Sequence, residues 1–196
     1  MQRNLPLRRI RDRSYKTYRA RVQSEKRLKA IGNWWNAAQV ALGSALLAVS
    51  IVFLKGDSAL LPGGDVSLAV LSVLSLVVSI VISNLSYAAR AQDMFRSYRE
   101  IQALSVEAER WLDTKVFVPK RDLDQISRQY QVLLDTSANH TTLDYLRAEA
   151  DGTLFSLPAP AAAASLIPYV TPTILISGSV AMVVFVVVKF IEAGIG

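Results

Sequence analysis

The chain has 196 residues, 52% of them apolar, and a formal net charge of +6. It contains no cysteine, which excludes a disulfide framework, a thiol nucleophile and a thiolate metal site. Its only histidine is His140, which argues against a histidine-based zinc site within one subunit, so we expect neither a bound metal nor a cofactor.

The basic residues gather at the N-terminus. Residues 1–33 hold eleven Lys or Arg and two acidic residues, whereas residues 88–172 hold nine Lys or Arg and eleven acidic residues. Residues 1–33 are also rich in good helix formers, which predicts a basic N-terminal helix. Short basic segments stay on the cytoplasmic side of a membrane, so we expect this helix in the cytosol; a nucleic-acid-binding arm is the weaker alternative.

Two uncharged apolar runs follow, at residues 34–54 and 66–87. Each is close to the roughly 20 residues that an α-helix needs to cross about 30 Å of hydrocarbon. Lipid offers no water to satisfy an exposed backbone, so runs that cross it must be helical. Residues 34–87 are therefore predicted to form a transmembrane hairpin whose connecting loop, residues 55–65, lies on the outer side of the membrane.

Each predicted span carries a face of small residues. On the first span this face consists of Ala38, Ala41, Ala45 and Ala48. On the second span a serine row recurs at three- and four-residue steps and consists of Ser72, Ser75, Ser79, Ser83 and Ser86. Small residues let helices approach closely in lipid, so the favoured interpretation is packing in a resting state, either between the two faces of the hairpin or between subunits. The alternative is that the serine row lines a polar pathway in an oligomer, and the two can hold in different states.

The second span is predicted to continue without a break into a cytosolic extension over residues 88–150, because neither Gly nor Pro occurs between Asp65 and Pro119. An apolar seam of period 3.5 runs along it through Ala91, Met94, Tyr98, Ile101, Ser105, Ala108 and Leu112. Its expected partner is the apolar side of residues 8–33, with the same helix of another subunit as the alternative. Shorter helices are predicted over residues 121–137 and 139–149.

Residues 151–172 are rich in proline and alanine and are predicted to be a linker at the membrane surface. Thr171 is a suitable N-cap for a helix whose first residue is Pro172. Residues 173–191 then form a predicted third transmembrane helix, with an in-plane or re-entrant helix as the alternative. The predicted fold is an all-α membrane protein with a transmembrane hairpin, a cytosolic helical bundle and a third, C-terminal transmembrane helix.

The sequence carries no motif of a known catalytic centre. It has no Gly-rich phosphate loop, no GxSxG sequence and no paired-histidine metal motif, so we do not expect an enzyme. His140 and Asp144 are four residues apart, which places them on one helix face. No nucleophile lies near them in the sequence, so a catalytic triad has little support.

The most distinctive stretch outside the apolar runs is a spaced element that contains Tyr130, Leu133, Leu134, Asn139, His140, Asp144 and Tyr145. With the basic helix and the hairpin before it, this element resembles the pattern of the SLATT domain over residues 10–147. SLATT is a two-span effector domain of bacterial conflict systems. The predicted third span, residues 173–191, departs from that two-span pattern.

The resemblance implies a pore-forming effector of anti-phage defence. Such a protein would be a homo-oligomer that permeabilises the inner membrane in abortive infection, triggered by a nucleotide second messenger or by a sensor protein encoded nearby. The trigger would act near Tyr130, Asn139, His140, Asp144 and Tyr145. The alternative for these residues is a structural lock in which Asn139 caps a helix, His140 hydrogen-bonds to the backbone or to Asp144, and Tyr145 packs. The alternative function is a non-conducting, membrane-anchored scaffold or accessory subunit that docks a soluble partner through residues 88–150.

Overall fold

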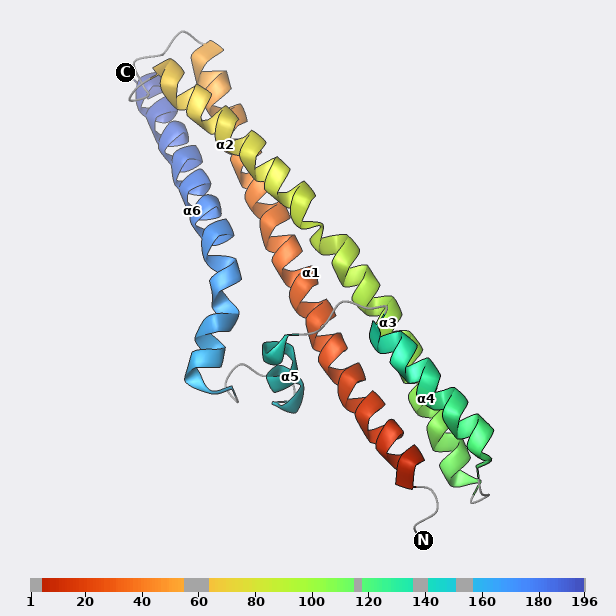
Figure 1. The fold of residues 1–196 in the computed structure, drawn as a ribbon. Helices are drawn as coiled ribbons and strands as arrows, with labels where there is room; N and C mark the ends of the chain where they lie inside the picture. The colour runs from red at the N-terminus through yellow and green to blue at the C-terminus, as the bar shows by residue number, and fades with distance from the viewer. Residues whose placement is uncertain (1–4, 55–63, 115–117, 136–140, 151–156, 196) are drawn as a thin grey trace. The chain divides into compact units, whose positions relative to one another are not determined.

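A computed structural model describes residues 5–54, 64–114, 118–135, 141–150 and 157–195 (Figure 1). The regular elements of these residues are all helices, namely α1 (Leu5–Leu54), α2 (Gly64–Leu85), α3 (Tyr87–Asp113), α4 (Lys120–Asp135), α5 (Thr142–Glu149) and α6 (Ala159–Ile195). Three stretches, in α1, α2 and α6, are long and apolar enough to cross a membrane. The predicted all-α membrane fold with three apolar helices is thereby confirmed.

The chain divides into two compact units. Unit 1 consists of residues 1–29 and 88–165, and unit 2 consists of residues 30–87 and 166–196. The basic residues of the N-terminus fall in unit 1, whereas the three apolar stretches fall mainly in unit 2. The helices α1 and α6 each contribute residues to both units.

The inward-facing side of α1 repeats every seven residues along its whole length. The two sets of buried or half-buried positions are Leu7, Ser14, Arg21, Leu28, Trp35, Leu42 and Val49, and Ile10, Thr17, Ser24, Ile31, Ala38, Ala45 and Val52. A seven-residue spacing keeps one side of a helix against its neighbours. The N-terminal helix and the first span, predicted as separate segments, are therefore one helix with one seam. Gly32 serves a close approach within unit 2, because a Cβ there would lie 3.1 Å from Cβ of Tyr87.

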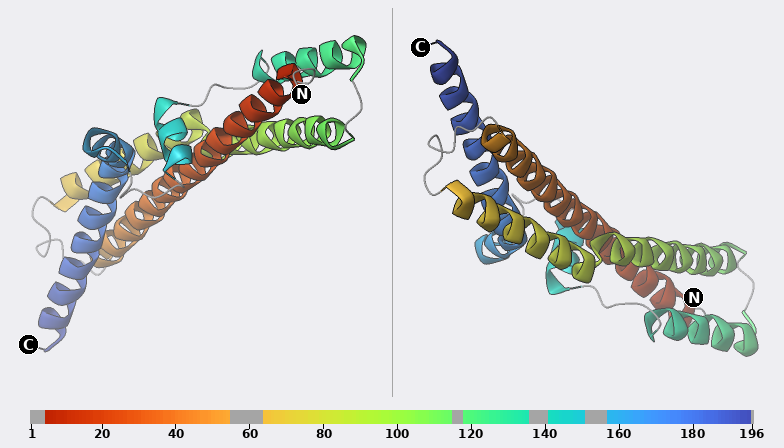
Figure 2. Two further views of the ribbon diagram at one scale, coloured as in Figure 1. Left: turned by 90° about the horizontal axis from the view of Figure 1, so that it is seen from below. Right: turned by 90° about the horizontal axis from the view of Figure 1, so that it is seen from above.

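In unit 1, α3 and α4 pack against the N-terminal part of α1 (Figure 2). The buried core consists of Leu7, Leu104, Ala108, Val118 and Ile126. The rings of Tyr18 and Tyr98 meet edge to face with centroids 5.8 Å apart, and Leu7 packs near the C-terminal end of α3, so α1 and α3 run antiparallel. The predicted pairing of residues 8–33 with this helix is confirmed.

The buried face of α3 differs from the predicted seam at several positions. Its buried residues are Ala91, Met94, Ser97, Ile101, Leu104 and Ala108. The expected seam positions Tyr98, Ser105 and Leu112 are only half-buried. The reason is that α3 packs against both α1 and α4, so its buried side is wider than a two-helix seam and is turned toward Ser97 and Leu104.

In unit 2, the apolar part of α1 packs with α2 and α6. The core there is formed by Val49, Val52 and Val186, against which Ala48, Leu68, Leu71 and Met182 pack. Near the start of the apolar run, the rings of Trp34 and Tyr169 meet edge to face with centroids 6.3 Å apart. A side-chain hydrogen bond joins α1 to α2, from Nε2 of Gln39 to Oγ of Ser79 at 2.9 Å.

The prediction of one unbroken helix from the second span to Leu112 is wrong. The helix α2 ends at Leu85 and α3 begins at Tyr87, with Ser86 between them at φ 44°. This left-handed conformation costs a non-glycine residue about 1 kcal/mol. The Ser86 hydroxyl donates to the carbonyl of Ser83 at 2.9 Å, and its N–H donates to the carbonyl of Ile82 at 3.3 Å. These local bonds satisfy the interrupted backbone where no Gly or Pro marks a break.

The predicted linker at residues 151–172 is wrong from residue 159 onward, because α6 begins at Ala159 and runs through Pro168 and Pro172. Pro158 accepts the first bonds of this helix, from the N–H groups of Ala161 and Ala162. Pro160 therefore lies in the first turn, where no backbone N–H needs an intrahelical partner. Thr171 is an interior residue and not an N-cap. Residues 151–156 lie outside the described residues.

Candidate functional site

The short helix α5 begins with a reciprocal capping box. Thr141 is the N-cap, and its hydroxyl accepts a hydrogen bond from the N–H of Asp144 at 3.3 Å. In return, Oδ2 of Asp144 accepts the N–H of Thr141 at 3.0 Å and the Thr141 hydroxyl at 2.8 Å. The sequence Thr-x-x-Asp thus satisfies the first backbone donors of the helix. The predicted role of Asn139 as the cap is wrong, and the helix begins at Thr142.

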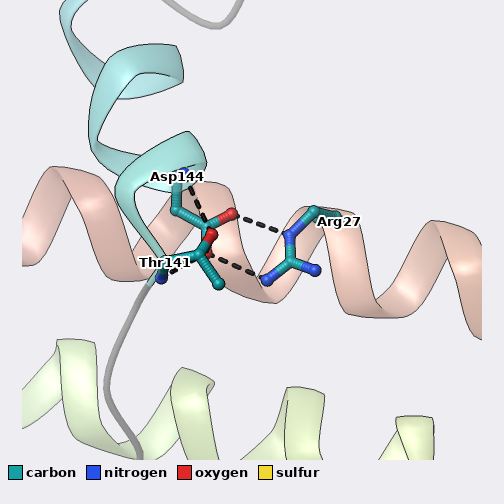
Figure 3. A network of polar contacts seen from close by, with 3 residues as sticks. All are labelled: Arg27, Thr141 and Asp144. Atoms are coloured by element: carbon teal, nitrogen blue, oxygen red, sulfur yellow. Dashed lines mark hydrogen bonds and ion pairs between the residues drawn. The ribbon is translucent and has the colours of Figure 1, made fainter. Parts of the chain in front are cut away.

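Arg27 of α1 completes this cluster (Figure 3). Its Nε donates to Oδ1 of Asp144 at 2.8 Å and its Nη2 donates to Oδ2 at 3.0 Å. The Asp144 side chain is fully buried, while that of Arg27 is 17% exposed. This two-pronged geometry is the strong form of a charge-assisted pair. It holds α5 against α1 across 117 residues of sequence.

The contacts of Asp144 also set its protonation. Burial alone raises the pKa of a carboxyl group, but the hydrogen bonds from Arg27 and Thr141 and the Arg27 charge outweigh it. The net effect holds the pKa of Asp144 below its ordinary value. The carboxylate is therefore ionised at neutral pH and occupied by donors from the protein itself. These contacts favour the structural role for Asp144, in which its carboxylate joins α5 to α1.

A second polar centre lies deeper in unit 1. Arg21 is 1% exposed, donates to the Ser97 hydroxyl of α3, and donates from Nη1 and Nη2 to the carbonyl of Leu133 at 3.3 and 3.4 Å. Its Nε is buried without a hydrogen-bond partner among the described residues. Burial lowers the pKa of Arg21, while Tyr130 and Glu100 oppose that effect. An arginine remains protonated in proteins, so this is a buried cation that joins α1, α3 and α4.

The predicted trigger residues are only partly brought together. Tyr130 shares a hydrogen bond with Thr17 at 3.1 Å, which ties α4 to α1. Tyr145 lines a small hollow of about 160 Å³ between α1 and α5. Asn139 and His140 lie outside the described residues. Sequence reasoning missed Arg21, Arg27 and Thr141. The capping-box sequence and the heptad position of Arg21 were the available signals.

The predicted serine row is only partly covered within the single chain. Ser72, Ser83 and Ser86 are exposed, and only Ser75 and Ser79 are half-buried. Among the described residues of α2, Val78 is the one that is buried. The hydroxyls of Ser72 and Ser79 donate back to carbonyls of α2, and the Ser79 hydroxyl also accepts the hydrogen bond from Gln39 of α1. The expectation that hairpin packing hides the row is therefore wrong for Ser72, Ser83 and Ser86, while packing of the row between subunits stays a prediction.

A larger groove of about 610 Å³ lies between α3 and α4 in unit 1. Its apolar lining is Ala103, Leu104, Val132 and Leu133, and its polar lining is Glu100, Glu107, Gln125, Arg128 and Gln129. This volume falls within the about 300–1,000 Å³ of ligand-binding clefts. No feature of the sequence predicted this groove as a site.

The fold and these contacts define an all-α membrane protein in which buried polar contacts of Arg21 and Asp144 join the helices of unit 1. The chain belongs to the SMODS and SLOG-associating 2TM effector domain family 5, whose family model matches residues 4–191. The predicted SLATT resemblance is confirmed. The match includes most of α6, so the third apolar helix lies within the matched domain, although the family is described as having two spans. Neither the curated proteins nor the solved structures gave a match to the chain.

Proposed function

We propose that this membrane effector forms pores in a bacterial anti-phage defence system. The chain would lie in the inner membrane with its N-terminus in the cytoplasm, where short basic segments are retained. It would assemble as a homo-oligomer, permeabilise the membrane and cause abortive infection. The activity requires no catalytic residue and no cofactor.

The observation that carries the proposal is the bare surface of α2. Only 6% of its apolar stretch is buried, compared with 28% for the stretch of α1. The exposed side includes Ser72 and Ser83 among large apolar residues. Helices in lipid associate through small residues and hydroxyls, so this surface suits contact with other copies. Several copies of α2 could then place their serine rows around a water-filled pore.

The trigger would be a nucleotide second messenger or a sensor protein that binds unit 1 near Asp144 and Tyr145. A ligand changes an equilibrium only if it binds one state better than the other. Binding at α5 would compete with the ion pair between Arg27 and Asp144. Because α2 and α3 are interrupted at Ser86, we assign transmission to α1, which is continuous from Leu5 to Leu54.

The test replaces two exposed serines of α2. Cells that express the Ser72→Leu, Ser83→Leu variant together with its trigger are expected to leak much less dye and far fewer ions than cells that express the natural chain. The matched control is Val73→Leu with Val77→Leu, which changes the same helix at exposed apolar positions and should leave leakage unchanged. Full leakage from the serine variant would remove the serine row from the mechanism.

The alternative function is the non-conducting scaffold or accessory subunit that docks a partner through residues 88–150. The groove between α3 and α4 favours it, because the groove lies within this segment and has an apolar floor. Conductance of the purified protein in a planar bilayer separates the two functions. A scaffold gives no current under any trigger, whereas a pore gives discrete steps once the trigger is added.

A further inference from the structure

The break between α2 and α3 rests on one strained residue. Ser86 has a φ of 44°, and it is the one non-glycine residue with a positive φ among those that the structure describes. A left-handed conformation is unfavourable for a residue with a side chain, so it persists only where the surrounding structure imposes it. The Ser86 side chain is exposed, so its own packing does not impose the conformation. The cause has to lie in the residues next to it.

Tyr87, the next residue, makes an unusually close contact with α1. A Cβ atom added to Gly32 would lie 3.1 Å from Cβ of Tyr87. Carbon atoms in ordinary contact are about 3.5–4.0 Å apart, so a residue without a side chain is needed where these two backbones meet. Both residues belong to unit 2. The contact with Gly32 therefore fixes the chain directly after Ser86, where the strained conformation has to be imposed.

The Ser86 side chain compensates for part of the break. In a continuous α-helix the carbonyl of Ser83 would accept the N–H of Tyr87. In the structure this carbonyl accepts the Ser86 hydroxyl at 2.9 Å. Serine hydroxyls offer the backbone such an alternative to the helical bond. Because the Ser83 carbonyl has a donor in either conformation, the side chain lowers the free-energy difference between an interrupted and a continuous helix.

A change at Ser86 alone would turn the serine row. A residue in a right-handed α-helix adds about 100° of turn, and a left-handed residue turns the chain in the opposite sense. With α3 packed on α1, the side of α2 that faces α1 therefore differs between the interrupted and the continuous helix. In the interrupted helix, the bond from Gln39 to Ser79 holds the middle of the row toward α1. Gln39 is seven residues from Gly32, so both contacts lie on one side of α1.

We propose that Ser86 and the contact between Gly32 and Tyr87 form a hinge with two states, and that this hinge sets the direction of the serine row. In the interrupted state, Tyr87 packs on Gly32 and Ser86 is left-handed. Ser79 is then bonded to Gln39. In the continuous state, α1 has moved away from Tyr87, Ser86 is right-handed, and the row has turned from α1 toward neighbouring copies. The inference rests on the proposed function, in which α1 transmits the trigger and the row lines the pore.

The first test measures hydrogen exchange of the amides of residues 87–89 in the full-length chain in lipid nanodiscs. These amides begin α3 in the interrupted state and lack intrahelical partners there, whereas the continuous helix protects them. Ser86→Ala removes the hydroxyl and introduces the best helix former. It should shift the equilibrium about fivefold toward the continuous helix and slow exchange. Ser86→Gly removes the strain of the left-handed conformation, so it should keep exchange fast.

The matched control for Ser86→Ala is Ser72→Ala. Ser72 is also exposed, and its hydroxyl also donates to a backbone carbonyl of α2, that of Leu68. Ser72 lies within the regular helix in both states, so its substitution should leave exchange of residues 87–89 unchanged. Equally slow exchange in both alanine variants, or equal exchange in Ser86→Ala and Ser86→Gly, overturns the hinge.

The second test follows the direction of the row by cross-linking, because the natural chain has no cysteine. Gln39→Cys with Ser79→Cys should form a disulfide within one chain in the interrupted state. Adding Gly32→Leu forces Tyr87 away from α1 and should lower the disulfide yield several-fold. The matched control adds Gly43→Leu, where an added Cβ meets no neighbouring helix within 4 Å, and it should keep the full yield. Circular dichroism identifies any variant that fails to fold, and the exchange result then decides.

Leakage separates the hinge from the function on which it rests. It is measured as release of carboxyfluorescein from liposomes of phosphatidylethanolamine and phosphatidylglycerol that contain the Gly32→Leu or the Gly43→Leu chain. A low disulfide yield together with stronger leakage from Gly32→Leu supports both the hinge and the pore. The same low yield without leakage supports the hinge and contradicts the pore. An unchanged disulfide yield in a helical Gly32→Leu chain overturns the hinge, whatever the leakage.

Discussion

Units 1 and 2 share one helix but are held together by different interactions. In unit 1 the seam of α1 includes the buried Arg21, and neighbouring Arg27 pairs with the buried Asp144. In unit 2 the same seam continues with Leu42, Ala45 and Val49, and the half-buried Ser79 of α2 accepts a hydrogen bond from Gln39 of α1. One heptad repeat therefore serves two kinds of packing.

The difference follows from the surroundings that each unit suits. In water, apolar burial supplies most of the stability, and buried polar groups must be paired. Between helices in lipid there is no hydrophobic driving force, and close van der Waals packing supplies much of the stability. Unit 1 has the paired polar groups of the first case, and unit 2 has the small and β-branched contacts of the second. Equal substitutions should therefore have unequal effects in the two units.

The largest expected difference is between two leucine truncations. Leu104→Ala in unit 1 should destabilise α3 by about 3 kcal/mol, because it loses both apolar transfer and packing. Leu42→Ala in unit 2 should cost about 1 kcal/mol in a bilayer, because lipid receives the side chain about as well as the protein does. Both leucines are at most 5% exposed. Hydrogen exchange of the two helices in nanodiscs measures the costs, and equal values would contradict the comparison.

Removal of Asp144 should have a comparable but local effect. Asp144→Ala leaves Arg27 without its partner and removes half of the capping box, so α5 should lose about 3 kcal/mol of protection. Hydrogen exchange should increase in α5 and remain normal in α4. Asp12→Ala is the control, because Asp12 pairs with Arg11 at the surface, and it should change stability by less than about 0.5 kcal/mol. Strong exchange in α4 as well would mean that the lock serves the whole of unit 1.

Acid should weaken the same lock. The pKa of Asp144 is lowered in the folded chain, so its contribution is fully present above the unfolded value of about 3.9 and declines as pH falls through the lower folded value. Protection of α5 should thus be constant from pH 7 to about 4 and fall below that range. Asp144→Asn should lack this acid-induced loss. A loss near pH 6 in the natural chain would assign it to a different group.

Periodicity and composition predicted the helices and one major pairing. The seam of residues 8–33 and the seven-residue spacing of α3 were enough to place these helices together, since both patterns are local. Tertiary packing then decided which side of α3 is most buried, because α4 adds a second neighbour. The ion pair between Arg27 and Asp144 joins residues that are distant in the sequence. The pattern around either residue does not predict which residue it pairs with.

The two helix boundaries that were predicted wrongly have physical causes. At Ser86 a serine adopts a left-handed conformation that sequence patterns associate with Gly or Asn. At α6 the prolines suggested a linker, yet Pro160 lies in the first turn, and Pro168 and Pro172 lie within the helix. Proline in membrane helices is tolerated where neighbouring groups satisfy the freed backbone. The carbonyls that lose an N–H donor are those of Ala164 and Pro168, four residues before the two prolines, and the Thr173 hydroxyl donates to the neighbouring carbonyl of Tyr169.

The smallest expected effect tests whether unit 2 has a polar lock of its own. Gln39→Leu removes the bond to Ser79, but the Ser79 hydroxyl still donates to the carbonyl of Ser75 at 2.9 Å. Interhelical hydrogen bonds in membranes average about 0.6 kcal/mol, so the loss should be near that value. Ser79→Ala is the matched control and should cost about the same, because it removes the same bond from the other side. A loss of several kcal/mol from either substitution, measured by hydrogen exchange of α2 in nanodiscs, would show that unit 2 depends on polar pairing as unit 1 does.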